Sequence, residues 1–295
     1  MPIRKAVIAA AGWGTRFLPA TKAIPKELVP IVDRPGIQWV VEEAAAAGVD
    51  HVVIVTSGSK RALEDHFDRT WELERLLERK GNQAMVERLR RISSLADFSF
   101  VRQSEARGLG HAVLTAQKLI GNEPFALLLP DDVIDAETPV LRQMIDVFDE
   151  YGGSVIAVEE VPHEDVSSYG VIDPEPVADR VFRIRGMVEK PPIEEAPSDL
   201  TVVGRYILTP EIFRVLADTP PGRGGEIQLT DAMEQLRREQ SFYGYQFRGI
   251  RYDAGTPFGF IEAVIELAIR DPELGERVRS YLRNLDVEQV LKAER

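Results

Sequence analysis

Short aliphatic runs alternate with helical patterns through the first half of the chain. Apolar residues that recur every three or four positions, such as Ile37, Val40, Val41 and Ala44, indicate helices between the runs. The runs themselves are apolar throughout, which is typical of strands covered on both faces. They lie at residues 6–10, 52–55, 98–101 and 125–129. This alternation predicts an α/β fold with a Rossmann-like, mixed but mostly parallel central sheet flanked by helices.

Residues 60–95 interrupt this alternation with two charge-rich helical stretches that are divided at Gly81-Asn82. The first stretch carries the apolar residues Trp71 and Leu76, and the second carries Val86. We therefore expect an inserted helical hairpin. Its many charged side chains favour a solvated outer face, with a partner surface as the alternative.

The second half of the chain is organised differently. Strands dominate after Ser154, and helices return after Thr209-Pro210 and Thr256-Pro257. In both dipeptides the threonine can cap a helix and the proline suits its first turn. The expected organisation is one domain over residues 1–270 and a helical tail over residues 271–295.

Composition and charge exclude several classes of protein. The 295 residues include 36 Lys and Arg against 48 Asp and Glu, a net charge of −12 at pH 7, which argues against a nucleic-acid partner. There is no cysteine, so disulfides, zinc–thiolate sites and a thiol nucleophile are ruled out. The four histidines are scattered and form no metal-binding pattern. No apolar run is long enough for a membrane span or a secretory leader, so we expect a cytoplasmic protein without a membrane partner.

A glycine-rich turn follows the first expected strand. Its sequence is Ala11-Gly12-Trp13-Gly14-Thr15-Arg16, and Lys22 and Lys26 come soon after. Glycines at this place expose backbone N–H groups that can hold phosphate oxygens, and the three cations stand out in an acidic chain. Phe17 breaks the dinucleotide fingerprint, and no P-loop motif is present. The turn indicates an anion site, and the alternative is a tight turn with exposed basic residues.

Acidic residues also follow expected strands. Asp131 and Asp132 come directly after the run at 125–129, and Asp253 ends a later strand. Carboxylates at this edge of a sheet suit Mg²⁺, which bridges protein oxygens to phosphate. A helix N-cap or an Asx turn is the alternative for Asp131 and Asp132, and a cap for the helix that begins near Pro257 is the alternative for Asp253.

Glu189-Lys190 ends another expected strand. A glutamate can accept hydrogen bonds from sugar hydroxyls and an ammonium can neutralise a phosphate, so the pair suits a sugar phosphate. A surface ion pair is the alternative.

Motifs spread over almost the whole chain carry a resemblance. They lie at residues 12–16, 18–27, 101–103, 108–112, 129–131, 169–170, 189–191, 203–206 and 225–232. Together they resemble the bacterial UTP–glucose-1-phosphate uridylyltransferases, a branch of the sugar-1-phosphate nucleotidyltransferases. The extended first motif and the insertion after Ser59 are similar to the uridylyl branch. The resemblance implies a nucleotide-diphospho-sugar transferase fold, with residues 1–270 as one catalytic domain.

The resemblance also implies roles for individual residues on the nucleotide side. According to the resemblance, five positions contact the uracil end of the nucleotide. The catalytic residues Arg16 and Lys26 contact the triphosphate and the leaving pyrophosphate. The uracil-end positions are Ala11, Gly12, Glu27, Gln103 and Gly108. Gly14 and Thr15 belong to the same nucleotide-binding loop, and Asp132 is a second carboxylate on this side.

Metal and sugar roles follow from the same resemblance. Asp131 and Asp253 match the ligands of a Mg²⁺ cofactor, and the resemblance also implies that Asp131 is catalytic. The sugar-phosphate site comprises four positions, of which Lys190 contacts the phosphate of glucose 1-phosphate and is catalytic. These positions are Gly170, Glu189, Lys190 and Gly204.

The reaction implied is Mg²⁺-dependent uridylyl transfer. A phosphate oxygen of glucose 1-phosphate would attack the α-phosphorus of UTP in line, giving UDP-glucose and pyrophosphate. A sugar phosphate is largely ionised at neutral pH, so no general base is needed. Two alternatives remain open: a thymidylyltransferase of similar fold, and a non-catalytic regulatory homologue that binds sugar nucleotides. The resemblance also implies a homodimer or homotetramer.

Overall fold

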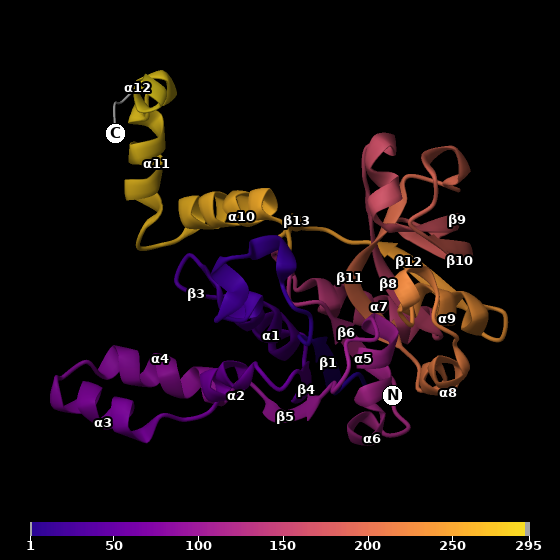
Figure 1. The fold of residues 1–295 in the computed structure, drawn as a ribbon, viewed down its shortest axis with the longest axis horizontal. Coiled ribbons are helices and arrows are strands. Elements are labelled where there is room, and N and C mark those ends of the chain that lie inside the picture. The colour runs from indigo at the N-terminus through magenta and orange to yellow at the C-terminus, as the bar shows by residue number, and fades with distance from the viewer. Residues whose placement is uncertain (1, 293–295) are drawn as a thin grey trace.

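A computed structural model describes residues 2–292, and Figure 1 shows their arrangement. Its centre is a nine-stranded sheet. In spatial order the strands are β5 (Asp97–Arg102), β4 (His51–Thr56), β1 (Lys5–Ala9), β6 (Phe125–Leu128), β11 (Leu200–Leu208), β8 (Ser154–Glu160), β12 (Phe242–Gln246), β10 (Val181–Glu189) and β9 (Gly170–Ala178). All four strands expected in the first half are present. Two small sheets pair β13 (Ile250–Asp253) with β7 (Asp132–Asp135) and β2 (Pro30–Ile31) with β3 (Arg34–Pro35).

Two strands of the large sheet run opposite to the other seven. The strands from β5 to β6 are parallel to one another, whereas β11 is antiparallel to both β6 and β8. Beyond them β12 is parallel to β8, and β10 is antiparallel to β12 and β9. The sheet is therefore mixed, as expected, with β11 and β10 as its reversed strands. Parallel strands need a long crossover, and only Asp179 and Arg180 separate β9 from β10.

Helices cover both faces of the sheet because the buried strands are apolar on both sides. Ala6 and Ile8 of β1 belong to one hydrophobic cluster, and Val7 belongs to the other. The first cluster includes residues of α1 (Gly36–Ala46) and α7 (Val140–Tyr151). The second includes residues of α5 (Leu109–Thr115), α6 (Gln117–Ile120), α8 (Glu211–Asp218) and α9 (Leu229–Arg237). This layering confirms the α/β class.

The segment between β4 and β5 forms three helices, α2 (Arg61–Phe67), α3 (Trp71–Arg79) and α4 (Gln83–Ser93). The turn between α3 and α4 contains Gly81 and Asn82, and the Asn82 side chain accepts a hydrogen bond from the N–H of Met85. Glu74 of α3 is buried between Arg69 and Arg90, at 2.9 Å and 2.8 Å from their Nε atoms. Hydrogen bonds from these two guanidinium groups lower the pKa of Glu74 to about 2. The hairpin extends away from the sheet in Figure 1.

The chain ends in α10 (Pro257–Arg270), α11 (Gly275–Asn284) and α12 (Val287–Lys292). Thr256 caps α10, since its hydroxyl accepts a hydrogen bond from the N–H of Gly259 at 3.2 Å. Ala263 and Leu267 of α10 pack against β2, β7 and β13 in a third cluster. Figure 1 shows α11 and α12 leading away from the body. None of the helices within residues 2–292 is long and apolar enough to cross a membrane.

Candidate active site

A cleft of about 390 Å³ opens where β1, β5 and β6 end. These strands are parallel, so their carboxyl ends meet at one edge of the sheet, the usual place for ligands in such folds. Residues from distant motifs line the cleft together. Among the residues expected at the nucleotide site, these are Ala11, Gly12, Thr15, Lys26, Glu27, Gln103, Gly108 and Asp131.

The glycine turn contains a left-handed residue, as anion-binding backbone turns commonly do. Gly14 has φ +63°, and its carbonyl accepts a hydrogen bond from the Thr21 hydroxyl at 2.7 Å. A Cβ at Gly14 would lie 3.0 Å from Cβ of Lys26, so the turn packs closely against this lysine. A short 3₁₀ turn, Thr15–Phe17, follows and carries the exposed Arg16. The turn thus places backbone donors and a cation beside the cleft.

Lys26 and Asp131 form an ion pair at the floor of the cleft, with Nζ 2.5 Å from Oδ2. Burial alone would lower the pKa of Lys26, but Asp131 outweighs this effect and the pKa is raised. Burial alone would raise the pKa of Asp131, but Lys26 and Arg16 hold it below its usual range. Both groups are therefore charged at neutral pH.

Asp131 and Asp253 point toward the same place. A Cβ built on Gly255 would lie 2.8 Å from Oδ2 of Asp131 and 2.9 Å from Oδ1 of Asp253. Thr256, not Asp253, caps the following helix, so the cap alternative for Asp253 is wrong; Oδ1 of Asp253 instead accepts a hydrogen bond from the N–H of Gly255 at 3.0 Å. Within residues 2–292 no group of three or more metal-binding side chains is present. Two carboxylates fit Mg²⁺, because this ion keeps several waters and takes further oxygens from phosphate.

Gln103 and Gly108 lie together at the other end of the cleft. The Gln103 amide nitrogen is 3.1 Å from the carbonyl of Gly108 and 2.9 Å from Nδ1 of His111. Gly108 has φ +95°, and a Cβ there would be 2.7 Å from Cβ of Glu226. Glu226 also lines the cleft. Glu226 belongs to the motif at 225–232, and the resemblance gives it no role.

Glu27 reaches the cleft from a buried position. Its carboxylate is paired with Lys60, whose Nζ is 2.8 Å from both oxygens. Burial raises the pKa of Glu27 against the influence of Lys60, and burial lowers the pKa of Lys60 against that of Glu27. Sequence reasoning missed Lys60, because a single lysine at the start of a charge-rich insertion gives no signal.

Asp132 and Gly204 are brought together outside the lining of the cleft. The carboxylate of Asp132 accepts hydrogen bonds from the N–H of Gly204 at 2.9 Å and from Nε of Arg251 at 2.5 Å. A Cβ at Gly204 would be 2.2 Å from Oδ2 of Asp132, so this position has room only for glycine. Both residues belong to a buried network beneath the turn that carries Asp131.

The residues expected at the sugar phosphate form a second group. Gly170 and Glu189 are paired across β9 and β10, and Nζ of Lys190 is 3.5 Å from Oε1 of Glu189. Oε2 of Glu189 accepts a hydrogen bond from the Thr230 hydroxyl at 2.7 Å. Lys190 has φ +47°, a strained backbone conformation, and residues in such conformations cluster at functional sites. Thr230 lies in the same motif as Glu226, and the resemblance gives it no role either.

Comparisons with known proteins agree with this geometry. The family model described as nucleotidyl transferase matches residues 5–269. The chain belongs to the nucleotidyl transferase family. A family member from Staphylococcus epidermidis, UTP–glucose-1-phosphate uridylyltransferase, is 50% identical over 285 residues, which cover 97% of this chain and 99% of that protein. The protein of the same name from Bacillus subtilis is 50% identical over 283 residues, which cover 96% and 97%.

Solved structures of the family are similar along the whole fold. A UDP-glucose pyrophosphorylase in complex with UDP-glucose is 47% identical, with a TM-score of 0.85 over 92% of this chain and 100% of that one. A UTP-bound enzyme from Acinetobacter baumannii is 40% identical, with a TM-score of 0.91 over 97% and 100%. A glucose-1-phosphate thymidylyltransferase from Bacillus anthracis, described as putative, is 22% identical with a TM-score of 0.70 over 93% of this chain and 98% of that one, and shows the common fold alone.

Proposed function

We infer that this chain is a UTP–glucose-1-phosphate uridylyltransferase, which converts UTP and glucose 1-phosphate into UDP-glucose and pyrophosphate. The observation that carries this conclusion is the convergence of the glycine turn, Lys26 and Asp131 in one cleft, in a chain half identical to enzymes of that name. The thymidylyltransferase is only a distant relative, at 22% identity. A non-catalytic binding protein would need neither a metal-binding carboxylate nor a cation for a leaving group.

Lys26 and Arg16 are our proposed contacts for the triphosphate. Lys26 is held at the cleft by Asp131, and the exposed Arg16 extends from the adjacent turn. Positive charge here offsets the repulsion between two anionic substrates and stabilises charge that develops on the transferred phosphoryl group. The backbone of the glycine turn would bind further phosphate oxygens, and Gln103 and Gly108 would bind the base.

Asp131 and Asp253 are the residues that would hold Mg²⁺. Their carboxylate oxygens approach the same point beside Gly255. When bound, the ion would neutralise phosphate charge and help to align the reacting groups. Asp131 also forms the ion pair that holds Lys26 in the cleft, so Asp131 has two roles in the proposed site.

Glu189 and Lys190 are our proposed contacts for glucose 1-phosphate. Thr230 donates a hydrogen bond to Oε2 of Glu189 and so fixes the carboxylate for sugar hydroxyls. Gly170 leaves space beside it, since a Cβ there would be 3.3 Å from Oε2 of Glu189. For Asp132 and Gly204 the buried hydrogen bonds support a structural task beneath the site rather than a ligand contact.

A substrate panel tests the proposed function. The protein is assayed with Mg²⁺, four nucleoside triphosphates including UTP and dTTP, and several sugar 1-phosphates, and pyrophosphate release is measured. We expect the highest kcat/KM with UTP and glucose 1-phosphate. A preference for dTTP would identify a thymidylyltransferase, and UDP-glucose binding without turnover would identify a regulatory homologue.

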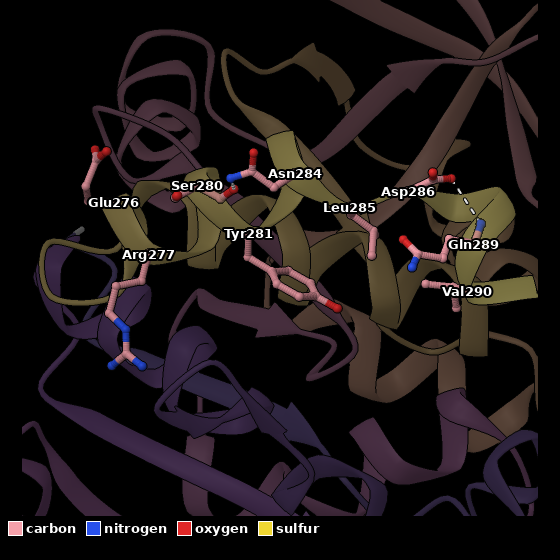
Figure 2. A pocket seen from close by; sticks show the side chains of 9 residues that line it. All are labelled: Glu276, Arg277, Ser280, Tyr281, Asn284, Leu285, Asp286, Gln289 and Val290. Carbon is pink, nitrogen blue, oxygen red and sulfur yellow. Dashed lines mark hydrogen bonds between the residues drawn. The ribbon is translucent and has the colours of Figure 1, made fainter. Parts of the chain in front are cut away.

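A homo-oligomer is a further part of the proposal. A groove of about 910 Å³ lies on α11 and α12, and Figure 2 shows the Tyr281 ring among the side chains that line it. Tyr281 and Val290 are 66% and 59% exposed and line the same groove, and apolar side chains that gather in one exposed patch mark protein–protein contacts. Light scattering of the wild type and of Tyr281→Ser tests whether this groove joins two copies. The cytoplasmic location and the separate tail over residues 271–295 stay predictions.

A further inference from the structure

Lys60 lies at the point where the inserted helices leave the sheet, directly before α2. It is only 6% exposed, although it carries an ammonium group. Its Nζ is 2.7 Å from the carbonyl oxygen of Ala10 and 2.8 Å from each carboxylate oxygen of Glu27. An ammonium group has three protons, so each has an acceptor.

The two residues that accept hydrogen bonds from Lys60 lie in or beside the cleft. Glu27 lines the cleft although its side chain is 1% exposed. Ala10 directly precedes Ala11 and Gly12, which also line the cleft. The neighbouring cation Lys26 is bonded to Asp131, so Lys60 alone donates side-chain hydrogen bonds to the Glu27 carboxylate within residues 2–292.

We propose that Lys60 is a positioning residue for nucleotide binding, which fixes the Glu27 carboxylate and the turn after Ala10 and so connects the helical insertion to the cleft. This inference rests on the proposed function. A side chain held in its binding geometry before the ligand arrives lowers the ordering cost of binding. Lys60 touches no expected substrate position itself and acts through Glu27 and the backbone.

Lys60→Met tests the inference, because methionine keeps an unbranched stem but removes all three donors. We expect the KM and the dissociation constant for UTP to rise about tenfold or more, as for the loss of charged hydrogen bonds. The KM for glucose 1-phosphate should stay within about twofold of the wild-type value. Gly170 and Glu189 lie on β9 and β10, and Lys190 directly follows β10, at the opposite edge of the sheet from β4 and β5, which flank the insertion. A merely structural role would instead lower the active fraction and leave both KM values unchanged.

Two further variants make the test specific. In Lys60→Met combined with Glu27→Gln, the buried carboxylate is no longer left without its partner, so we expect a UTP affinity no worse than that of Glu27→Gln alone. If Lys60→Met does not fold, the UTP affinity of this double variant still tests the inference. Lys80→Met is the control, since it removes the same charge from the exposed turn between α3 and α4. We expect wild-type constants for it.

The inference is overturned if Lys60→Met binds UTP as the wild type does, or if the two substitutions are additive. UTP binding is measured by calorimetry as well as by turnover. If the wild type binds UTP but releases no pyrophosphate, the proposed function fails, and the dissociation constants still decide the role of Lys60.

Discussion

Arg205 of β11 is a fully buried guanidinium, and its replacement by methionine gives the largest stability effect that we expect. Its Nη2 is 2.8 Å from Oε2 of Glu43 and 2.6 Å from the carbonyl oxygen of Asp132. Its Nη1 is 3.2 Å from the carbonyl oxygens of both Leu129 and Gly204. Two of these carbonyls belong to residues on either side of the Pro130-Asp131 turn. Arg205 therefore fixes the turn that carries Asp131.

Arg205→Met leaves the Glu43 carboxylate, which is 9% exposed, without its charged partner and with the N–H of Leu141 as its remaining hydrogen-bond donor. Removal of one member of a buried ion pair costs about 3–5 kcal/mol. The lost hydrogen bonds to three carbonyls act in the same direction, so we expect a cost at the upper end of this range. The free energy of unfolding is measured by urea denaturation, followed by circular dichroism.

Arg214→Met is the matched control, because Arg214 forms an exposed ion pair with Glu239. Such pairs contribute about 0–1 kcal/mol. If Arg205→Met costs no more than this control, the buried network does not stabilise the turn and the reasoning fails. In the combination of Arg205→Met with Glu43→Gln, part of the loss should be recovered, because no uncompensated charge then remains buried.

Three further results are expected. Asp131→Asn should lower kcat about 100-fold or more at saturating UTP and limiting Mg²⁺, and near-normal turnover would contradict its proposed metal role. Gly108→Ala should raise the KM for UTP about tenfold through backbone strain and contact with Glu226, whereas Gly121→Ala, with φ +75° and no neighbour within 4 Å, should not. Glu74 has a folded pKa of about 2, below its unfolded value, so its ion pairs stabilise the hairpin above about pH 4.5 and are lost as the pH falls toward 2. The protection factors of amides in α3 and α4, which correct for the intrinsic exchange rate at each pH, should fall over that range in the wild type, whereas those of Glu74→Gln should be low at pH 7 as well.

Sequence patterns predicted the structure best where a pattern is compatible with a single local structure. Apolar runs gave the positions of the parallel strands, and strand-end reasoning placed Asp131 at the correct edge of the sheet. It could not distinguish Asp131 from Asp132, because adjacent residues of one turn point in different directions. Asp131 faces the cleft, whereas Asp132 bonds to Arg251, a residue 119 positions away.

Identical local patterns also had different outcomes. Thr256-Pro257 begins a helix with a hydroxyl cap, as expected. In Thr209-Pro210 the threonine hydroxyl instead bonds to the side chain of Gln240, and the following helix has no side-chain cap. A tertiary partner thus replaced the local one. Lys60 was missed because its hydrogen-bond acceptors, Ala10 and Glu27, are distant in the sequence and no local pattern connects them to it.

The bond between Lys26 and Asp131 means that, before any substrate arrives, the cleft already carries its own counterion. If Asp131 held Mg²⁺ as proposed, Lys26 would lose this carboxylate and would need a new negative partner. A triphosphate at the proposed site would supply that partner. Binding of the ion and binding of the nucleotide would then favour each other.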